Sequence, residues 1–96
     1  MRNIVLSPKA IDDLIEQALY LLERSNNLQT AQSHIDKIHT FLEETLTRFP
    51  YMGHPADEYE EPGIHKLVFM GYTILYRLTE EHIHIVTIFR QNLPRL

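Results

Sequence analysis

Two arginines and a pair of histidines stand in the most apolar part of the sequence, residues 71–91. His82 and His84 are two positions apart, with Arg77 before them and Arg90 after them. Alternate side chains of a strand point to one face, so the two imidazoles would lie side by side on a sheet. Two histidines can begin a metal site, but the chain has no cysteine and no evident third ligand nearby. A pair of surface histidines is the simpler interpretation, and we expect no cofactor.

A cluster of carboxylates between residues 57 and 61 is the second group that could do chemistry. Paired carboxylates serve in acid–base catalysis and in metal binding, and this cluster contains Asp57, Glu58, Glu60 and Glu61. Its setting is a segment rich in proline and glycine, which favours a solvated acidic loop. The sequence contains no glycine-rich phosphate loop, nucleophile elbow or metalloprotease helix. We therefore predict no catalytic residues.

The charge is unevenly distributed along the chain. The net charge is −4; residues 1–62 carry five basic and eleven acidic side chains, and residues 63–96 carry four and two. The acidic part would repel phosphates, so direct nucleic-acid binding by the chain alone is not expected. At 96 residues and 44% hydrophobic, the chain predicts a single domain, 1–96. Neither a signal peptide nor a membrane segment is evident, which favours the cytoplasm.

Two helices and several strands would position these side chains. Ser7 and Pro8 predict a helix start, and apolar residues at helical spacing continue over 8–24. A second helix is predicted over about 28–48, after a short break, so the two must form an antiparallel pair. Strands are predicted over 2–6, 66–70, 72–78 and 83–90, with a loop over 50–63. The fold class is then α+β, in the order β-α-α-β-β-β: a mostly antiparallel sheet with a helical hairpin packed on one face.

The turn between the last two strands predicts their register. If Thr79 to His82 close the turn, Arg77 pairs with His84. The face beneath the helices would then carry Tyr72, Ile74, Tyr76, Leu78, Ile83, Ile85, Thr87 and Phe89. The other face would carry Thr73, Leu75, Arg77, His82, His84, Val86, Ile88 and Arg90. A shared core is predicted for Leu14, Ile35, Ile38, Leu42, Ile74, Tyr76 and Ile85.

The face away from the helices would be both apolar and cationic. Leu75, Val86 and Ile88 fall between the two arginines there. Such a mixed patch suggests that a partner covers it. The alternative is a half-solvated sheet on which arginine stems lie over aliphatic side chains.

The frame of motifs LSPKAIDDL, FPYMGHP, PGIHKLVFMGYTILYRL and HIVTIFRQ resembles the ParE branch of the RelE/ParE superfamily of bacterial toxins. The resemblance covers essentially the whole chain. It implies the toxin of a type II toxin–antitoxin system, held inactive by a cognate antitoxin protein whose C-terminal segment wraps it. ParE-like members are linked to inhibition of DNA gyrase, whereas RelE-like members cut mRNA on the ribosome with several basic groups on the open sheet face.

Two departures bear on this choice. Where RelE-like toxins carry an arginine after the Gly-Tyr of the middle strand, this chain has Thr73, and after the last strand it has QNLPRL. We therefore favour a protein-binding inhibitor of gyrase over a nuclease, with an inactive toxin-like co-repressor scaffold as a third reading. The chain also departs from many ParE sequences, at His65 and at Arg90. Candidate target-binding residues are Lys66, Arg77, His84, Arg90 and Arg95. Candidate antitoxin-binding residues are Leu75, Val86 and Ile88.

Overall fold

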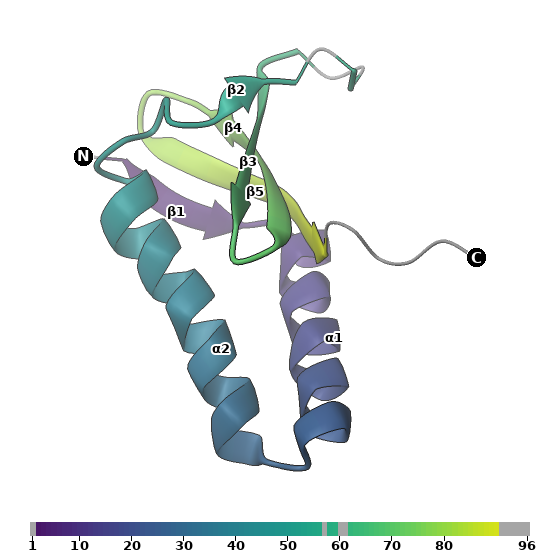
Figure 1. Ribbon diagram of the computed structural model, residues 1–96. Helices are drawn as coiled ribbons and strands as arrows, with labels where there is room; N and C mark the ends of the chain where they lie inside the picture. Colours follow the sequence, from purple (N-terminus) through teal and green to yellow (C-terminus); the bar gives the residue numbers. More distant parts are fainter. Residues whose placement is uncertain (1, 57, 60–61, 91–96) are drawn as a thin grey trace.

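The structure, a computed structural model, describes residues 2–56, 58–59 and 62–90, which form two helices packed against a five-stranded sheet (Figure 1). The elements are β1 (Asn3–Leu6), α1 (Pro8–Ser25), α2 (Leu28–Thr40), the π-helical segment η1 (Phe41–Leu46), β2 (His54–Pro55), β3 (Ile64–Phe69), β4 (Tyr72–Leu78) and β5 (His82–Arg90). Strand order is β1-β5-β4-β3-β2; β1 is parallel to β5 and the other pairs are antiparallel. The predicted α+β fold class is confirmed. The short strand β2 lies within the segment predicted as loop.

Both helices begin at side-chain caps. Ser7 Oγ accepts a hydrogen bond from Ala10 N at 2.9 Å, and Asn27 Oδ1 accepts one from Thr30 N at 3.2 Å. Between them, Asn26 takes a left-handed conformation (φ 56°) that ends α1, as asparagine commonly does. The break is therefore two residues long, and the helices fold back as an antiparallel pair.

One hydrophobic core joins the hairpin to the sheet. The predicted core is confirmed, with Ile35 partly buried at its border. The apolar spacing that predicts the first helix includes Ile11, Leu14 and Ile15, and a buried stripe through all three is wrong in part, because α1 turns Ala10, Asp13 and Leu14 inward. Ile11 and Ile15 are instead 45% and 54% exposed.

The π-helical segment keeps the second helix in contact with this core. Ile38, Leu42 and Leu46 are all fully buried, although they are spaced by four residues. Four residues exceed one turn of an α-helix but fall short of one turn of a π-helix, so the step from Ile38 to Leu42 and the step from Leu42 to Leu46 offset each other and keep all three side chains on the core side.

A β-bulge changes the predicted faces of β5. Arg77 pairs with His84 as predicted, but Leu75 pairs with Thr87, so Val86 is an extra residue. Beyond the bulge Ile88, Phe89 and Arg90 lie on the opposite face from the predicted one. Ile88 is in the core beneath the helices, and Phe89 is 39% exposed on the far side.

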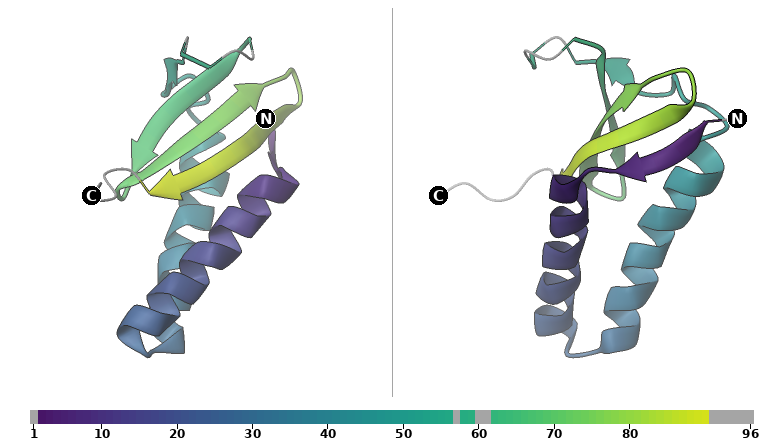
Figure 2. Two further views of the ribbon diagram at one scale, coloured as in Figure 1. Left: turned by 90° about the vertical axis from the view of Figure 1, so that its right-hand side faces the viewer. Right: turned by 180° about the vertical axis from the view of Figure 1, so that it is seen from behind.

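The helical hairpin extends past the sheet, so that its connecting turn lies far from the strands (Figure 2). No helix among the described residues is long and apolar enough to cross a membrane. The sheet face away from the helices is called the open face below.

Candidate functional site

Arg77 and His84 lie side by side on the open face, close to the turn that joins β4 to β5. They are directly paired between β4 and β5, with Val5 of β1 next to His84 and Ile64 of β3 next to Arg77. The rings of His82 and His84 are 5.6 Å apart on the same strand face, as the sequence predicted. Across residues 2–56, 58–59 and 62–90, no three His, Asp or Glu side chains are grouped to hold a metal ion.

Lys66 also lies on the open face, one row away from Arg77. It pairs with Leu75 of β4 and His54 of β2, and its ammonium forms an ion pair of 3.6 Å with Glu58. The lysine is thus partly neutralised by the acidic loop. The remaining carboxylates of that loop, Asp57, Glu60 and Glu61, lie outside the described residues, as does Arg95.

Arg90 is on the side of the sheet that faces the helices, which corrects the prediction that it lies beside Arg77. The bulge at Val86 causes the change. Its guanidinium stacks over the Tyr20 ring of α1 at 5.0 Å, and Arg24 approaches the same ring at 5.5 Å. Cation–π contacts of this kind hold an arginine against an aromatic surface while its N–H edge stays available.

His34 links the second helix to the sheet beside Arg90. The Tyr72 hydroxyl donates to Gln17 Oε1 at 3.3 Å and shares a hydrogen bond of 2.8 Å with His34 Nε2, in which the imidazole is the donor when Nε2 carries the proton. Burial, and then the charges of Lys37 and Arg90, hold the pKa of His34 below its ordinary value. Burial raises the pKa of Tyr72. No local pattern around His34 indicates this contact, because its partner Tyr72 lies 38 residues away in the sequence.

The three apolar candidates do not form one exposed patch. Leu75 is on the open face but only 4% exposed, because Ala56, Ile64 and Tyr59 pack over it. Val86 borders the same cluster and is half-buried. Ile88 is 1% exposed in the main core, so its predicted place on the open face is wrong.

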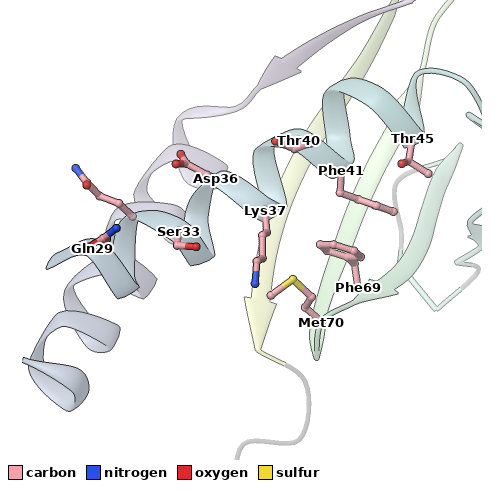
Figure 3. Close-up of a pocket in the computed structure, with 10 residues that line it drawn as sticks. Gln29, Ser33, Asp36, Lys37, Thr40, Phe41, Thr45, Phe69 and Met70 are labelled. Atoms are coloured by element: carbon pink, nitrogen blue, oxygen red, sulfur yellow. The ribbon is translucent and has the colours of Figure 1, made fainter. Parts of the chain in front are cut away.

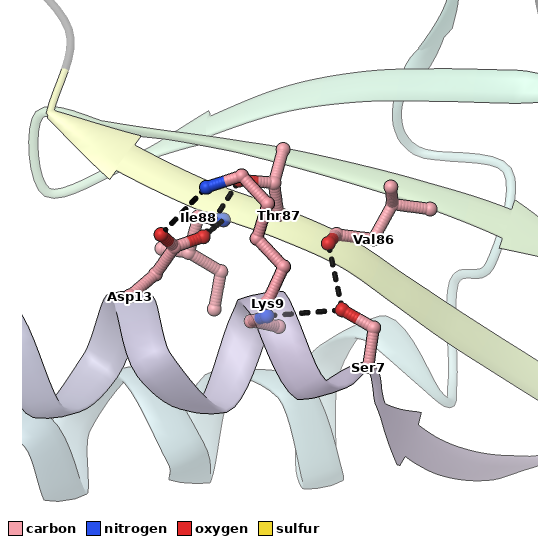
Figure 4. Close-up of polar contacts among 7 residues, drawn as sticks. Ser7, Lys9, Asp13, Val86, Thr87 and Ile88 are labelled. Atoms are coloured by element: carbon pink, nitrogen blue, oxygen red, sulfur yellow. Dashed lines mark hydrogen bonds and ion pairs between the residues drawn. The ribbon is translucent and has the colours of Figure 1, made fainter.

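Asp13 makes a contact that the sequence did not reveal. Its carboxylate accepts hydrogen bonds from Thr87 Oγ1 at 2.6 Å and Ile88 N at 3.0 Å (Figure 4). Lys9 pairs with it at 3.0 Å from one turn earlier. Burial opposes ionisation of Asp13, but the hydrogen bonds from Thr87, Ile88 and Lys9 outweigh burial and lower its pKa.

These contacts continue the sheet edge where β1 ends. Ser7 N bonds to Ile85 O at 3.0 Å, and Ser7 Oγ donates to Val86 O at 2.7 Å (Figure 4). Asp13 then accepts the hydrogen bond that Ile88 N donates. The side chains of the cap residue Ser7 and of Asp13 in α1 therefore satisfy backbone groups of β5 at the edge where β1 has ended. The bulge that sends Arg90 to the helix side is thereby fixed in place.

Comparison with known proteins gives the family. The profile described as the ParE toxin of type II toxin–antitoxin systems, parDE, matches residues 4–92. The chain belongs to this ParE toxin family, as its sequence resemblance implied. It is therefore the toxin of a type II toxin–antitoxin system. No curated protein matches the sequence significantly.

Solved structures of toxin–antitoxin systems share the fold. The chromosomal ParDE system from P. aeruginosa matches with 16% identity and a TM-score of 0.63, covering 96% of this chain and 98% of that chain. The RelBE2 complex from Mycobacterium tuberculosis matches with 17% identity and a TM-score of 0.70, covering 94% and 98%. The E. coli DinJ–YafQ complex matches with 17% identity and a TM-score of 0.54, covering 93% and 91%. At these identities the likeness establishes the RelE/ParE-like fold.

Proposed function

We propose that this toxin acts in the bacterial cytoplasm by binding a protein target, DNA gyrase, and that a cognate antitoxin neutralises it. The supporting observation is the separation of the candidate cationic groups by the sheet. Arg77, His84 and Lys66 lie on the open face, whereas Arg90 lies against Tyr20 on the other side. A ParE-type mechanism requires no RNA chemistry and is compatible with this arrangement.

RNA cleavage requires several chemical groups around one phosphate, and this arrangement supplies few of them. It needs a base for the 2′-OH, an acid for the leaving oxygen and cations around one phosphate. Lys66 is paired with Glu58, and Thr73 of β4, where RelE-like toxins carry arginine, is 1% exposed. On the open face, Arg77 and the His82–His84 pair then stand with one partly neutralised lysine. That set suits contact with a protein surface better than catalysis on a polyanion.

The open face offers the mixed chemistry of a protein interface. Val68 and Phe89 are 52% and 39% exposed, and they flank Thr73 in one row of the sheet. Arg77 stands two residues along β4 from Leu75, and an arginine can bind a carboxylate through its planar fork while its stem covers apolar surface. We assign this face, including Arg77 and His84, to the target.

The antitoxin would cover exposed apolar surface on the first helix. Ile11, Ile15 and Leu19 recur at four-residue steps on α1 and are 45%, 54% and 59% exposed. A ridge of this kind fits the apolar side of a partner segment that folds on binding. Val86 at the border of the open face extends the surface, whereas the burial of Leu75 and Ile88 removes them as antitoxin contacts.

A ribosome-dependent mRNA endonuclease is the second candidate. It is favoured by the presence of Lys66, Arg77 and His84 on one face and by the shared fold of the RelBE2 complex. Purified toxin should be tested for inhibition of gyrase supercoiling and for cleavage of mRNA on programmed ribosomes. We expect gyrase inhibition that Arg77→Ala weakens and Arg48→Ala, an exposed control, leaves unchanged.

The outcomes of the two assays distinguish a gyrase inhibitor from an endonuclease and from a co-repressor scaffold. Cleavage of mRNA that disappears with Arg77→Ala would replace the gyrase proposal with the endonuclease. A folded protein that is inert in both assays, yet strengthens operator binding by its antitoxin, would be a co-repressor scaffold.

A further inference from the structure

A groove lies between α2 and the turn that joins β3 to β4, away from the open face (Figure 3). Its volume is about 610 Å³. Phe41 of η1 and Phe69 of β3 stack within it, with ring centroids 4.0 Å apart and planes at 12°. Met70 in the turn is 42% exposed beside them. The groove therefore offers an aromatic floor and a flexible thioether to an apolar side chain.

Met70 occupies a backbone conformation that its side chain disfavours. The two-residue turn has φ of +53° at Met70 and +81° at Gly71, as in the tight hairpin turns that prefer Asn-Gly. Methionine is not suited to the first position, because its Cβ meets the backbone in left-handed conformations. Strain kept at one exposed position, beside a groove, indicates a role for that side chain in binding.

Lys37 gives the groove a cationic rim. In Figure 3 its ammonium extends toward Met70, while the Asp36 carboxylate points the other way. The ion pairs found among the described residues are Lys9–Asp13, His39–Glu43 and Lys66–Glu58, and none includes Lys37. A second hollow of about 360 Å³ adjoins it and is lined by His34 and Lys37 with polar side chains of α2.

Arg90 and Arg24 extend this cationic rim toward α1. Both guanidiniums lie over Tyr20, and Arg90 pairs across the sheet with Tyr72, the hydrogen-bond partner of His34. Neither arginine belongs to an ion pair found in the described part of the chain. In a chain of net charge −4, these cations belong to none of those ion pairs, and Asp36 is the one carboxylate among the residues that the structure describes that lines the groove, so the group has a surplus of hydrogen-bond donors for an anion.

We propose that the groove and its rim form a docking surface for an acidic amphipathic segment of a partner protein. An aromatic or aliphatic side chain of the segment enters between Phe41, Phe69 and Met70, and its carboxylates meet Lys37 and Arg90. A nucleic acid fits less well, because the floor is apolar and a single lysine lines the groove. The surface is separated by the sheet from Arg77 and His84, so it stands independently of the proposed target face.

The test is a titration of the isotope-labelled full chain with a synthetic peptide that carries one tryptophan flanked by glutamates. We expect chemical-shift changes concentrated at Lys37, Phe41, Phe69 and Met70. Lys37→Gln should weaken binding about 5- to 10-fold, the size expected for a partly exposed charge-assisted bond. The matched control Arg48→Gln, at an exposed cation outside the groove, should bind as the unaltered chain does.

Met70→Asn gives a second, independent readout. Asparagine suits the turn, so the melting temperature should rise by a few degrees while peptide affinity falls several-fold. Loss of affinity in a more stable protein cannot be ascribed to misfolding. Unchanged affinity in this variant would remove Met70 from the surface.

Four further results would overturn the proposal. The peptide could fail to bind at millimolar concentration, or bind equally well with glutamines in place of its glutamates. The shift changes could fall at Arg77 and His84. A single-stranded RNA oligonucleotide could bind more tightly than the peptide at the same Lys37-dependent site. Self-association abolished by Lys37→Gln would instead identify a second copy as the occupant.

Discussion

Replacing Asp13 with alanine would test the contact that joins α1 to the bulged strand. Asp13 is 8% exposed, and its carboxylate is the acceptor for Thr87 Oγ1 and for Ile88 N. Alanine leaves a buried hydroxyl and a buried backbone N–H without that acceptor, at about 1–3 kcal/mol for each group. Water can enter the vacated space and the hydroxyl can rotate, so we expect a loss of about 2–4 kcal/mol in the free energy of unfolding.

The pH dependence provides a sharper test of the same contact. The pKa of Asp13 is lowered in the folded state, so its contribution is present above the ordinary carboxyl pKa of about 4. It is lost as the pH falls through the lowered folded-state value, because the folded protein must then take up the proton that it resists. Asp13→Asn keeps the side-chain size but cannot ionise, so this part of the acid dependence should be absent.

Urea unfolding followed by circular dichroism, at neutral pH and at several acidic values, measures both effects. Asp12→Asn is the matched control, since Asp12 is the exposed neighbour on the same helix. A change below about 0.5 kcal/mol for Asp13→Ala, typical of a surface substitution, would refute the reasoning. So would an Asp13→Asn protein whose stability declines with acid as steeply as that of the unaltered chain.

Three other substitutions probe the core and the sheet by the same denaturation assay. Ile38→Ala should cost about 2–5 kcal/mol, since Ile38 is fully buried and a cavity would remain; a near-neutral result would contradict its central place. Gly53→Ala should destabilise, because a Cβ there would lie 2.6 Å from the Tyr76 hydroxyl, which Gly53 N also bonds; an unchanged midpoint would show that the loop yields easily. Thr73→Val should stabilise by about 1 kcal/mol, because the buried Thr73 hydroxyl has no hydrogen-bond partner among the described residues; destabilisation would reveal a partner, such as a bound water.

Local pattern was sufficient to predict both helices, four of the five strands and most of the core, but not the short strand β2 or the π-helical segment η1. Ser7-Pro8 fixed the helix start by capping chemistry, and Ile38, Leu42 and Ile74 were predicted in the core from periodicity alone. The buried side of α1 could not be predicted from the sequence, because Ile11 and Ile15 are as apolar as Leu14. Which of them faces the sheet depends on the angle at which the helix crosses it, and no local pattern encodes that angle.

The face on which each candidate residue of β5 lies could be predicted only for the positions up to Val86. Strand alternation placed Arg77 opposite His84 correctly, since the turn at Thr79 and His82 closes as expected. The extra residue at Val86 has no signature in HIVTIFR, because the contacts that hold it come from Ser7 and Asp13, far away in sequence. Long-range hydrogen bonds therefore decided on which face Arg90 lies.

The position of β5 between β1 and β4 has a consequence for synthesis on the ribosome. Of the five strands, β5 is translated last, yet it is the only one in the described structure that pairs with β1. Until His82–Arg90 have emerged, β1 has no strand neighbour for its backbone groups. The Asp13 carboxylate likewise lacks the Ile88 N–H from which it accepts a hydrogen bond. Because such long-range pairings form slowly, the helical hairpin and an incomplete sheet must coexist for a time in the nascent chain. Throughout that interval the apolar residues that later form the core are uncovered and accessible to chaperones.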